Sequence, residues 1–246
     1  SVNSDIVASR ISSAGVLLDP GPRSVLPETY YGRGDLQLAY AGGVYLMAYE
    51  ESITGYDPTN AIRFDTGLNL LDAAPFAFAP SPLARLISNG SGFYAVWVEQ
   101  LPDFTVAVKG SRIGLNGQKL DGGGSGVNIS GPNQPGGYTT TSVAWDGSQW
   151  KVTWGSLTET RLARVSSGGQ VLDPGGVLVA GATTGTSASA SAGNGSVQLA
   201  WSDFVSVGQT GSYEVFSIHI NSSNVAGATR TLSIGAPAQL RSDVAT

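Results

Sequence analysis

A short phrase recurs along this chain, and it constrains the possible folds more than any other feature. The phrase is "RISSAGVLLDPG" at Arg10 and "RVSSGGQVLDPGG" at Arg164. Variants of it start at Arg63 ("RFDTGLNLLDAAP"), at Arg112 ("RIGLNGQKLDGGG") and, more weakly, at His219 ("HINSSNVAGATR"). The five starts follow one another at intervals of 49 to 55 residues. A fixed period of this length is typical of repeat architectures, in which each repeat is one supersecondary unit.

A second phrase falls between the copies of the first. It consists of an apolar strand, a glycine-rich turn and another apolar strand, and it occupies Leu38 to Glu51, Leu86 to Gln100, Val143 to Ser156 and Ala190 to Asp203. Each period therefore contains two hairpins, and four-stranded sheets repeated at this spacing are typical of β-propeller blades. We expect an all-β fold: a five-bladed β-propeller of four-stranded antiparallel blades, forming one domain over residues 1–246.

The composition agrees with many short strands and tight turns. The chain has 34 Gly, 12 Pro and only 13% charged residues, and glycine and proline favour turns rather than long helices. The absence of cysteine excludes a disulfide scaffold, a thiolate metal site and a cysteine nucleophile. A net charge of −5 without a basic cluster argues against nucleic acid as a partner. No apolar run reaches the roughly 18 residues that a membrane span needs.

In four copies of the first phrase, an arginine is followed nine residues later by an aspartate. The pairs are Arg10 and Asp19, Arg63 and Asp72, Arg112 and Asp121, and Arg164 and Asp173. If Arg112 faces Asp121 across a hairpin, Asn116-Gly117 forms the turn, and this dipeptide is preferred in two-residue type I′ turns. We predict four cross-strand ion pairs. In the fifth copy, His219 and Ala228 take the two positions, so we assign the single histidine a structural role.

Aromatic residues recur at one position of the second phrase. These residues are Tyr49, Trp97, Trp154 and Trp201, and the position four residues earlier holds Tyr45, Phe93, Trp150 and Val197. Residues i and i+4 lie on the same face of a strand, so we expect these side chains to pack blade against blade.

The ends of the chain predict how the ring closes. The sequence begins with an outer hairpin and ends with "QLRSDVAT", which has the pattern of an innermost strand. We expect the last blade to be shared between N-terminal and C-terminal strands. Its second strand has no counterpart in the sequence, and an unpaired edge there favours self-association by strand pairing.

Two resemblances follow from these segments. The "A-S-R-I-S-x-x-G-x-x-L-D-P-G" segment, together with "x-x-G-x-Y-x-x-x-W/Y", resembles the repeats of large secreted or surface-exposed bacterial propeller proteins. That resemblance implies a secreted or cell-surface bacterial protein and a scaffold with no assigned catalytic motif. The five-blade count is also similar to that of tachylectin-2-type lectins and of arabinanase-type glycosidases.

Catalytic motifs are scarce in the sequence. It contains no G-x-S-x-G, H-E-x-x-H, P-loop or G-x-G-x-x-G. A glycosidase needs two carboxylates at one sugar, and the segments expected at the mouth of the central channel contain only Asp35 and Asp243. An enzyme is therefore the less favoured expectation, and we expect no cofactor and no metal.

The loops after the second strand of each blade are variable in length and carry acidic residues beside aromatic ones. Variable loops on a rigid scaffold are where binding sites tend to lie. The candidate ligand-binding residues are Tyr56, Asp57, Asp103, Phe104, Asp203 and Phe204. We predict a non-enzymatic, lectin-like module that binds glycans. The alternatives left open are a structural domain that binds other surface proteins, and a five-bladed glycoside hydrolase.

Overall fold

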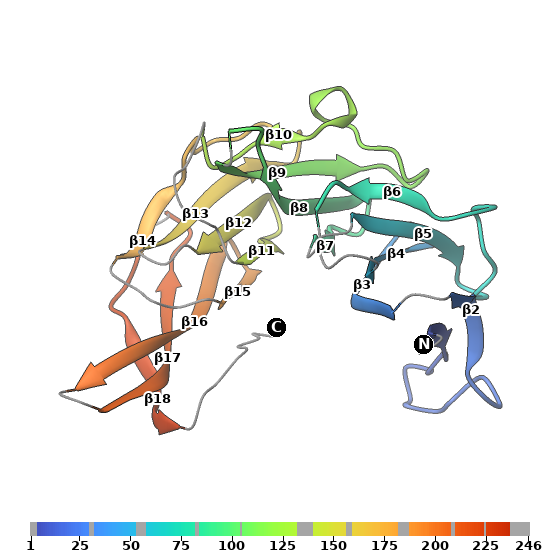
Figure 1. The fold of residues 1–246 in the computed structure, drawn as a ribbon, viewed down its shortest axis with the longest axis horizontal. Helices are drawn as coiled ribbons and strands as arrows, with labels where there is room; N and C mark the ends of the chain where they lie inside the picture. The colour runs from blue at the N-terminus through green and yellow to red at the C-terminus, as the bar shows by residue number, and fades with distance from the viewer. Residues whose placement is uncertain are drawn as a thin grey trace.

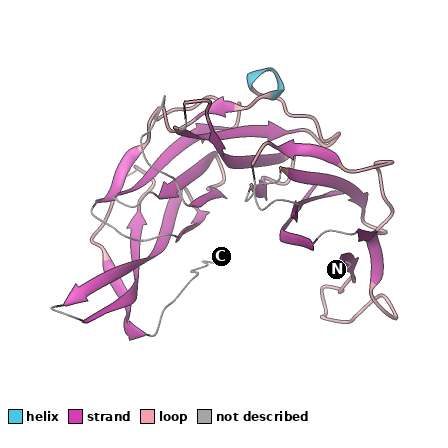
Figure 2. Ribbon diagram, in the orientation of Figure 1, coloured by secondary structure: helices cyan, strands magenta, loops and turns pink. Residues whose placement is uncertain are grey.

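In the computed structural model, the chain is a five-bladed β-propeller. The structure describes residues 4–29, 32–52, 58–81, 84–103, 105–131, 140–155, 159–181, 187–207, 210–223 and 225–236. Strands account for nearly all of the regular structure in these residues, with one 3-10 helix, η1 (Gly122–Gly124) (Figure 2). None of the helical structure described is long and apolar enough to span a membrane.

Four blades have four antiparallel strands each, paired in chain order. The first comprises β3 (Gly32–Ala41), β4 (Val44–Ser52), β5 (Thr59–Asp65) and β6 (Phe76–Ala79); the second β7 (Arg85–Ser88), β8 (Phe93–Gln100), β9 (Val106–Ile113) and β10 (Val127–Asn128); the third β11 (Thr140–Trp145), β12 (Gln149–Gly155), β13 (Glu159–Ser166) and β14 (Val177–Gly181); the fourth β15 (Ser187–Gly193), β16 (Ser196–Val207), β17 (Thr210–Ile220) and β18 (Arg230–Ala236). The strands β3, β7, β11 and β15 border the central space (Figure 1).

The fifth blade is represented by a two-stranded sheet of β1 (Ser4–Ala8) and β2 (Arg23–Thr29). These strands contain the first copy of the repeated phrase and correspond to the third and fourth strands of a whole blade. The predicted inner strand at Gln239 to Val244 lies outside the described residues, so the closure expected between the two ends of the chain stays a prediction.

The repeated aromatic residues form the core, as expected. The side chains of Tyr49, Trp97 and Trp154 are each 1% exposed, and that of Trp201 is 3% exposed. Trp97 of the second blade packs in a cluster with Ala48 and Phe78 of the first. Burying a large aromatic side chain removes about 150–250 Å² of surface from water. Adjacent blades are therefore held together mainly by apolar contact.

The four predicted Arg–Asp ion pairs are all present. The Nη2–Oδ1 distances are 2.7 Å for Arg10–Asp19, 2.5 Å for Arg63–Asp72, 2.7 Å for Arg112–Asp121 and 2.7 Å for Arg164–Asp173. Each aspartate also accepts a hydrogen bond from the backbone N–H of its arginine, at 2.7–3.0 Å. The carboxylate thus satisfies a main-chain donor as well as the guanidinium.

The turn predicted between the paired residues is wrong. In the second blade, Gly117 N donates to Gly114 O and Gly114 N donates to Gln118 O, so the loop has three residues rather than two. Only the last of these, Gly117, has a positive φ, of 82°. This arrangement is a type I turn followed by a left-handed residue in a bulge. Leu120 N consequently pairs with Arg112 O, and Asp121 lies one residue further on and reaches back to its arginine.

In the second and third blades, the hairpin turn lies against the ion pair of the preceding blade. A Cβ atom added at Gly169 would be 2.5 Å from Asp121 Oδ1 and 2.7 Å from Arg112 Nε. Arg63 Nη1 likewise donates to Leu115 O in the next hairpin, at 2.7 Å. The repeated phrase therefore builds a hairpin and also couples it to its neighbour.

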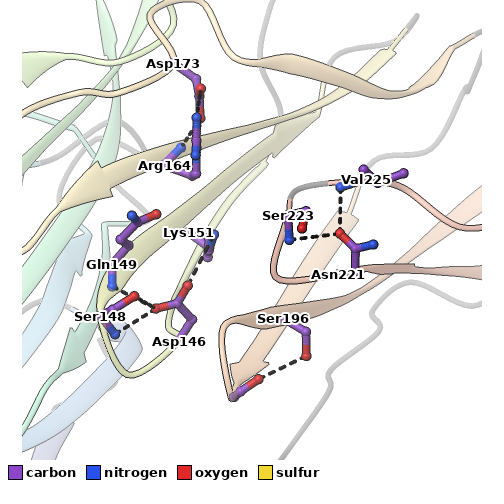
Figure 3. A network of polar contacts seen from close by, with 11 residues as sticks. Asp146, Ser148, Gln149, Lys151, Arg164, Asp173, Ser196, Asn221, Ser223 and Val225 are labelled. Carbon is purple, nitrogen blue, oxygen red and sulfur yellow. Dashed lines mark hydrogen bonds and ion pairs between the residues drawn. The ribbon is translucent and has the colours of Figure 1, made fainter.

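The third blade contains a buried ion pair that the sequence pattern did not predict. Lys151 Nζ lies 3.2 Å from Asp146 Oδ2, and both side chains are 2% exposed. Asp146 Oδ1 also accepts hydrogen bonds from Ser148 N, Ser148 Oγ and Gln149 N (Figure 3). Burial alone would raise the pKa of the Asp146 carboxyl, but these donors and Lys151 together hold it below its ordinary value.

Candidate functional site

The innermost strands carry one acidic residue among their described positions, Asp35 on β3. Its expected partner Asp243 lies outside the described residues. Among the described residues, an acidic site at the central space can therefore involve only Asp35 and residues of β4, the strand that pairs with β3.

Asp35 lies in a β-bulge. Gly34 is paired with Glu50, and Gln37 is paired with Ala48, so Asp35 and Leu36 together face the single residue Tyr49. Asp35 has a φ of 44°, the left-handed conformation that glycine normally adopts at such a bulge. An aspartate tolerates this conformation better than most residues, but it still costs roughly 1–2 kcal/mol. Residues held in a strained backbone conformation of this kind cluster at functional sites.

A buried arginine lies two residues before Asp35. The Arg33 side chain is 4% exposed, and its Nε is 3.6 Å from Glu51 Oε1. Its guanidinium carbon lies 5.4 Å from the centre of the Tyr49 ring, and its Nη1 donates to Leu26 O of the fifth blade at 3.4 Å. Arg33 therefore fixes the position of the Glu51 carboxylate and ties the first blade to the fifth.

Three acidic residues lie at this end of the β3–β4 pair: Asp35, Glu50 and Glu51. Glu50 and Glu51 point to opposite faces of β4 because side chains alternate along a strand, so Asp35 has an acidic neighbour on either side of the sheet. All three residues are half-buried. We call these three residues the axial acidic cluster.

The sequence-predicted ligand residues do not come together in the described part of the chain. Asp103 Oδ1 accepts hydrogen bonds from Thr105 N (3.1 Å) and Thr105 Oγ1 (2.5 Å), which lower the pKa of its carboxyl. Tyr56, Asp57 and Phe104 lie outside the described residues. Their role stays a prediction.

Asp203 and Phe204 are in a strand and not in the loop that the sequence suggested. Strands β16 and β17 continue as one long hairpin, in which Asp203 pairs with Glu214 and Phe204 with Tyr213. The variable length and the acidic and aromatic residues of this segment had favoured a loop. Cross-strand pairing within the blade overrides that local preference.

The residues that sequence reasoning missed are Arg33, Glu50 and Glu51. The second repeated phrase ends with both glutamates, but only Asp35 and Asp243 were expected at the mouth of the channel. The strand pattern of β4 could have identified the two glutamates. When β4 continues to Glu51, Glu50 lies opposite Gly34 and Glu51 lies opposite Arg33.

No model of a known protein family matches the sequence, and no curated protein sequence is similar to it. Solved structures do match the fold. A thermostable family-43 glycoside hydrolase is 10% identical, with a TM-score of 0.52 over 85% of this chain and 74% of that one. The GH43 endo-arabinanase of Bacillus licheniformis (13% identity, TM-score 0.45, covering 82% and 80%) and the catalytic domain of the Coprinopsis cinerea GH62 alpha-L-arabinofuranosidase (14%, 0.47, 82% and 68%) also match.

The match to the family-43 glycoside hydrolase agrees with the class of fold that the strands define, a five-bladed β-propeller. The prediction of a non-enzymatic, lectin-like module is contradicted, because the solved structure that matches this fold at a TM-score of 0.52 is named as a glycoside hydrolase. The resemblance to bacterial surface repeats finds no matching family model. At 10% identity, the likeness shows the fold and leaves the chemistry to be argued from the residues.

Proposed function

We propose that this propeller hydrolyses glycosidic bonds at the axial acidic cluster. The observation that carries the proposal is Asp35, an acidic residue held in a glycine-like conformation on an innermost strand, with Glu50 and Glu51 on the paired strand. A further support is the shared fold with a family-43 glycoside hydrolase.

The chemistry requires one carboxylic acid and one carboxylate on the two sides of the scissile bond. Asp35 and Glu50 are the reacting pair in this proposal, since they occupy neighbouring positions across the bulge. Glu51, held by the buried guanidinium of Arg33, is a positioning residue that supplies fixed negative charge near the developing positive charge on the sugar. A secreted or cell-surface location belongs to the same proposal, because polysaccharides are extracellular substrates.

The test is release of reducing sugar from arabinan, galactan and xylan. Asp35→Asn is the decisive variant because asparagine also tolerates positive φ, so the fold is retained while the ionisable group is lost. We expect Asp35→Asn and Glu50→Gln each to lower turnover at least 100-fold. Asp65→Asn, in an outer hairpin turn away from the innermost strands, is the matched control and leaves turnover unchanged. Activity that survives in Asp35→Asn refutes the assignment.

A protein-interaction role is the second candidate, and it depends on the fifth blade. In every whole blade the third strand is paired on both sides, whereas β1 pairs with β2 alone among the described residues. An unpaired strand edge is a template for strand addition. Light scattering tests this role: association that disappears in Val7→Lys supports it, and a monomer at all concentrations opposes it.

A further inference from the structure

A cavity between the first and second blades contains charged residues that the axial cluster does not use. Its volume is about 360 Å³, within the range of small-molecule sites, and one wall consists of Ala77, Phe78, Ala79 and Pro80 from the outer strand of the first blade. The opposite wall contains Trp97, Glu99, Lys109 and Lys119 from the second blade. The strands concerned are β6 of the first blade and β8 and β9 of the second, which are neighbouring blades of the ring (Figure 1).

The charged residues in this cavity are ordered by direct contacts. Lys109 Nζ lies 2.9 Å from Glu99 Oε1, and Trp97 Nε1 donates to Glu99 Oε2 at 3.3 Å. Both oxygens of Glu99 are therefore engaged, and one positive charge is neutralised. Lys119 Nζ lies 5.5 Å from the centre of the Trp97 ring, and it has no hydrogen bond or ion pair with any described residue. The cavity therefore has one positive charge in excess.

The internal repeat shows that the fold itself does not require a lysine here. Each outer hairpin has a bridge at the same place, and the residues on its second strand are Leu17, Leu70, Lys119, Val171 and Ala226. Four of the five blades thus use an apolar residue. Val171, in the next blade, packs against an apolar cluster.

Lysine at this position carries an energetic cost. Burial lowers the pKa of the Lys119 ammonium, although the Glu99 carboxylate acts in the opposite direction. A shift of this sign means that the surroundings disfavour the charged form. A residue that breaks a sequence pattern kept by the rest of the fold, such as a lysine at an otherwise apolar position of a repeat, is expected most often at a functional or strained site.

We propose that this cavity binds a small carboxylate, with the Lys119 ammonium as its counter-ion. An anion placed there supplies the charge-assisted hydrogen bonds that Lys119 lacks, and the apolar wall of the first blade contacts the rest of the ligand. The carboxylate comes either from a free organic acid or from an acidic sugar. The site is separate from the axial acidic cluster and does not depend on the proposed hydrolysis.

Two of the loops expected to bind a ligand lie next to cavity-lining residues in the sequence. Tyr56 and Asp57 directly precede Pro58, which lines the cavity, and the loop with Asp103 and Phe104 directly follows the strand that contains Glu99. Two of the three predicted ligand loops therefore flank the cavity in sequence. The lysines were not expected as ligand residues, because the acidic and aromatic residues alone suggested the site.

The experiment uses isothermal titration of the whole chain with sodium glucuronate, with sodium acetate, and with neutral glucose at the same ionic strength. We expect saturable binding of glucuronate and none of glucose. Binding of acetate with equal affinity assigns the site to free carboxylates, and a preference of tenfold or more for glucuronate assigns it to acidic sugars. No saturable binding of either carboxylate overturns the proposal.

The decisive variant is Lys119→Val, which introduces the residue that the next blade has at this position. Glucuronate affinity falls at least tenfold, while the melting temperature stays the same or rises. Gln118→Val, one residue away on the exposed side of the hairpin, is the matched control and binds as the unaltered chain does. Unchanged affinity in Lys119→Val overturns the proposal. A lowered melting temperature overturns it as well, since the lysine would then be a packing residue that covers Trp97.

Discussion

The buried pair of Lys151 and Asp146 offers a quantitative test of the third blade. Both side chains are 2% exposed, so removing one partner leaves a charge inside the protein. Breaking such a pair typically costs about 3–5 kcal/mol. Asp146 keeps three hydrogen bonds from Ser148 and Gln149, which places Lys151→Met near the lower limit, at about 3 kcal/mol.

The double variant Lys151→Met/Asp146→Asn distinguishes charge from packing. Asparagine can still accept the hydrogen bonds from Ser148 and Gln149, and no unpaired charge remains. We expect the double variant to lie within about 1 kcal/mol of the unaltered chain, since neutral replacement of a buried pair is often tolerated. The single variant is then the less stable of the two.

The assay is urea unfolding followed by tryptophan fluorescence, and Trp150 beside Lys151 is a local reporter. The pH dependence provides a second measurement. Because the folded-state pKa of Asp146 is lowered, its contribution is complete above the unfolded value of 3.8 and is lost as pH falls below it. Double and single variants of equal stability would refute the reasoning, because the cost would then come from packing.

Three further predictions concern the repeated hairpin. Gly169→Ala should lower the free energy of unfolding by about 2 kcal/mol or more, since a φ of 86° is combined with a clash against the carboxylate of the preceding blade. Gly15→Ala has a similar φ but open space around it, so it should cost only the roughly 1–2 kcal/mol of the left-handed conformation. Urea unfolding compares the two variants. Replacing His219 by Arg and Ala228 by Asp together should stabilise the fourth blade by about 0.2–1 kcal/mol, and a double-mutant cycle showing no coupling would contradict this. The arginine partner lowers the pKa of Asp19 from 3.8 to about 2, so the stability that this pair contributes should be complete above pH 3.8 and lost as pH falls toward 2, which acid titration of folding measures.

The repeat structure could be predicted because its signals are local. Hairpins, strand periodicity and the Arg–Asp spacing depend on residues within about ten positions of one another, and such patterns are legible in a single sequence. The turn type was wrong because a two-residue and a three-residue loop both place a glycine near the middle of the phrase. Only the backbone hydrogen bonds of Gly114 and Gly117 distinguish them.

The candidate sites could be predicted only in part, because they combine distant segments. Lys119 and Phe78 come from different blades and meet at one cavity, and nothing in their sequence neighbourhoods refers to the other. The strain at Asp35 depends on a one-residue shift of register between β3 and β4, and single-residue bulges leave no pattern in composition.

The sequence by itself determined the number of blades, the identity of the core aromatics and the partners of the four ion pairs, since each is written once per repeat and depends on short-range geometry. Tertiary structure alone decided what the residues of each repeat contact. Lys119 lines a cavity because the neighbouring blade supplies the opposite wall, and Arg33 is buried where it reaches Leu26 of the fifth blade. The physical reason is that a repeated sequence specifies the same local fold each time, while desolvation and charge depend on what the next blade places against it.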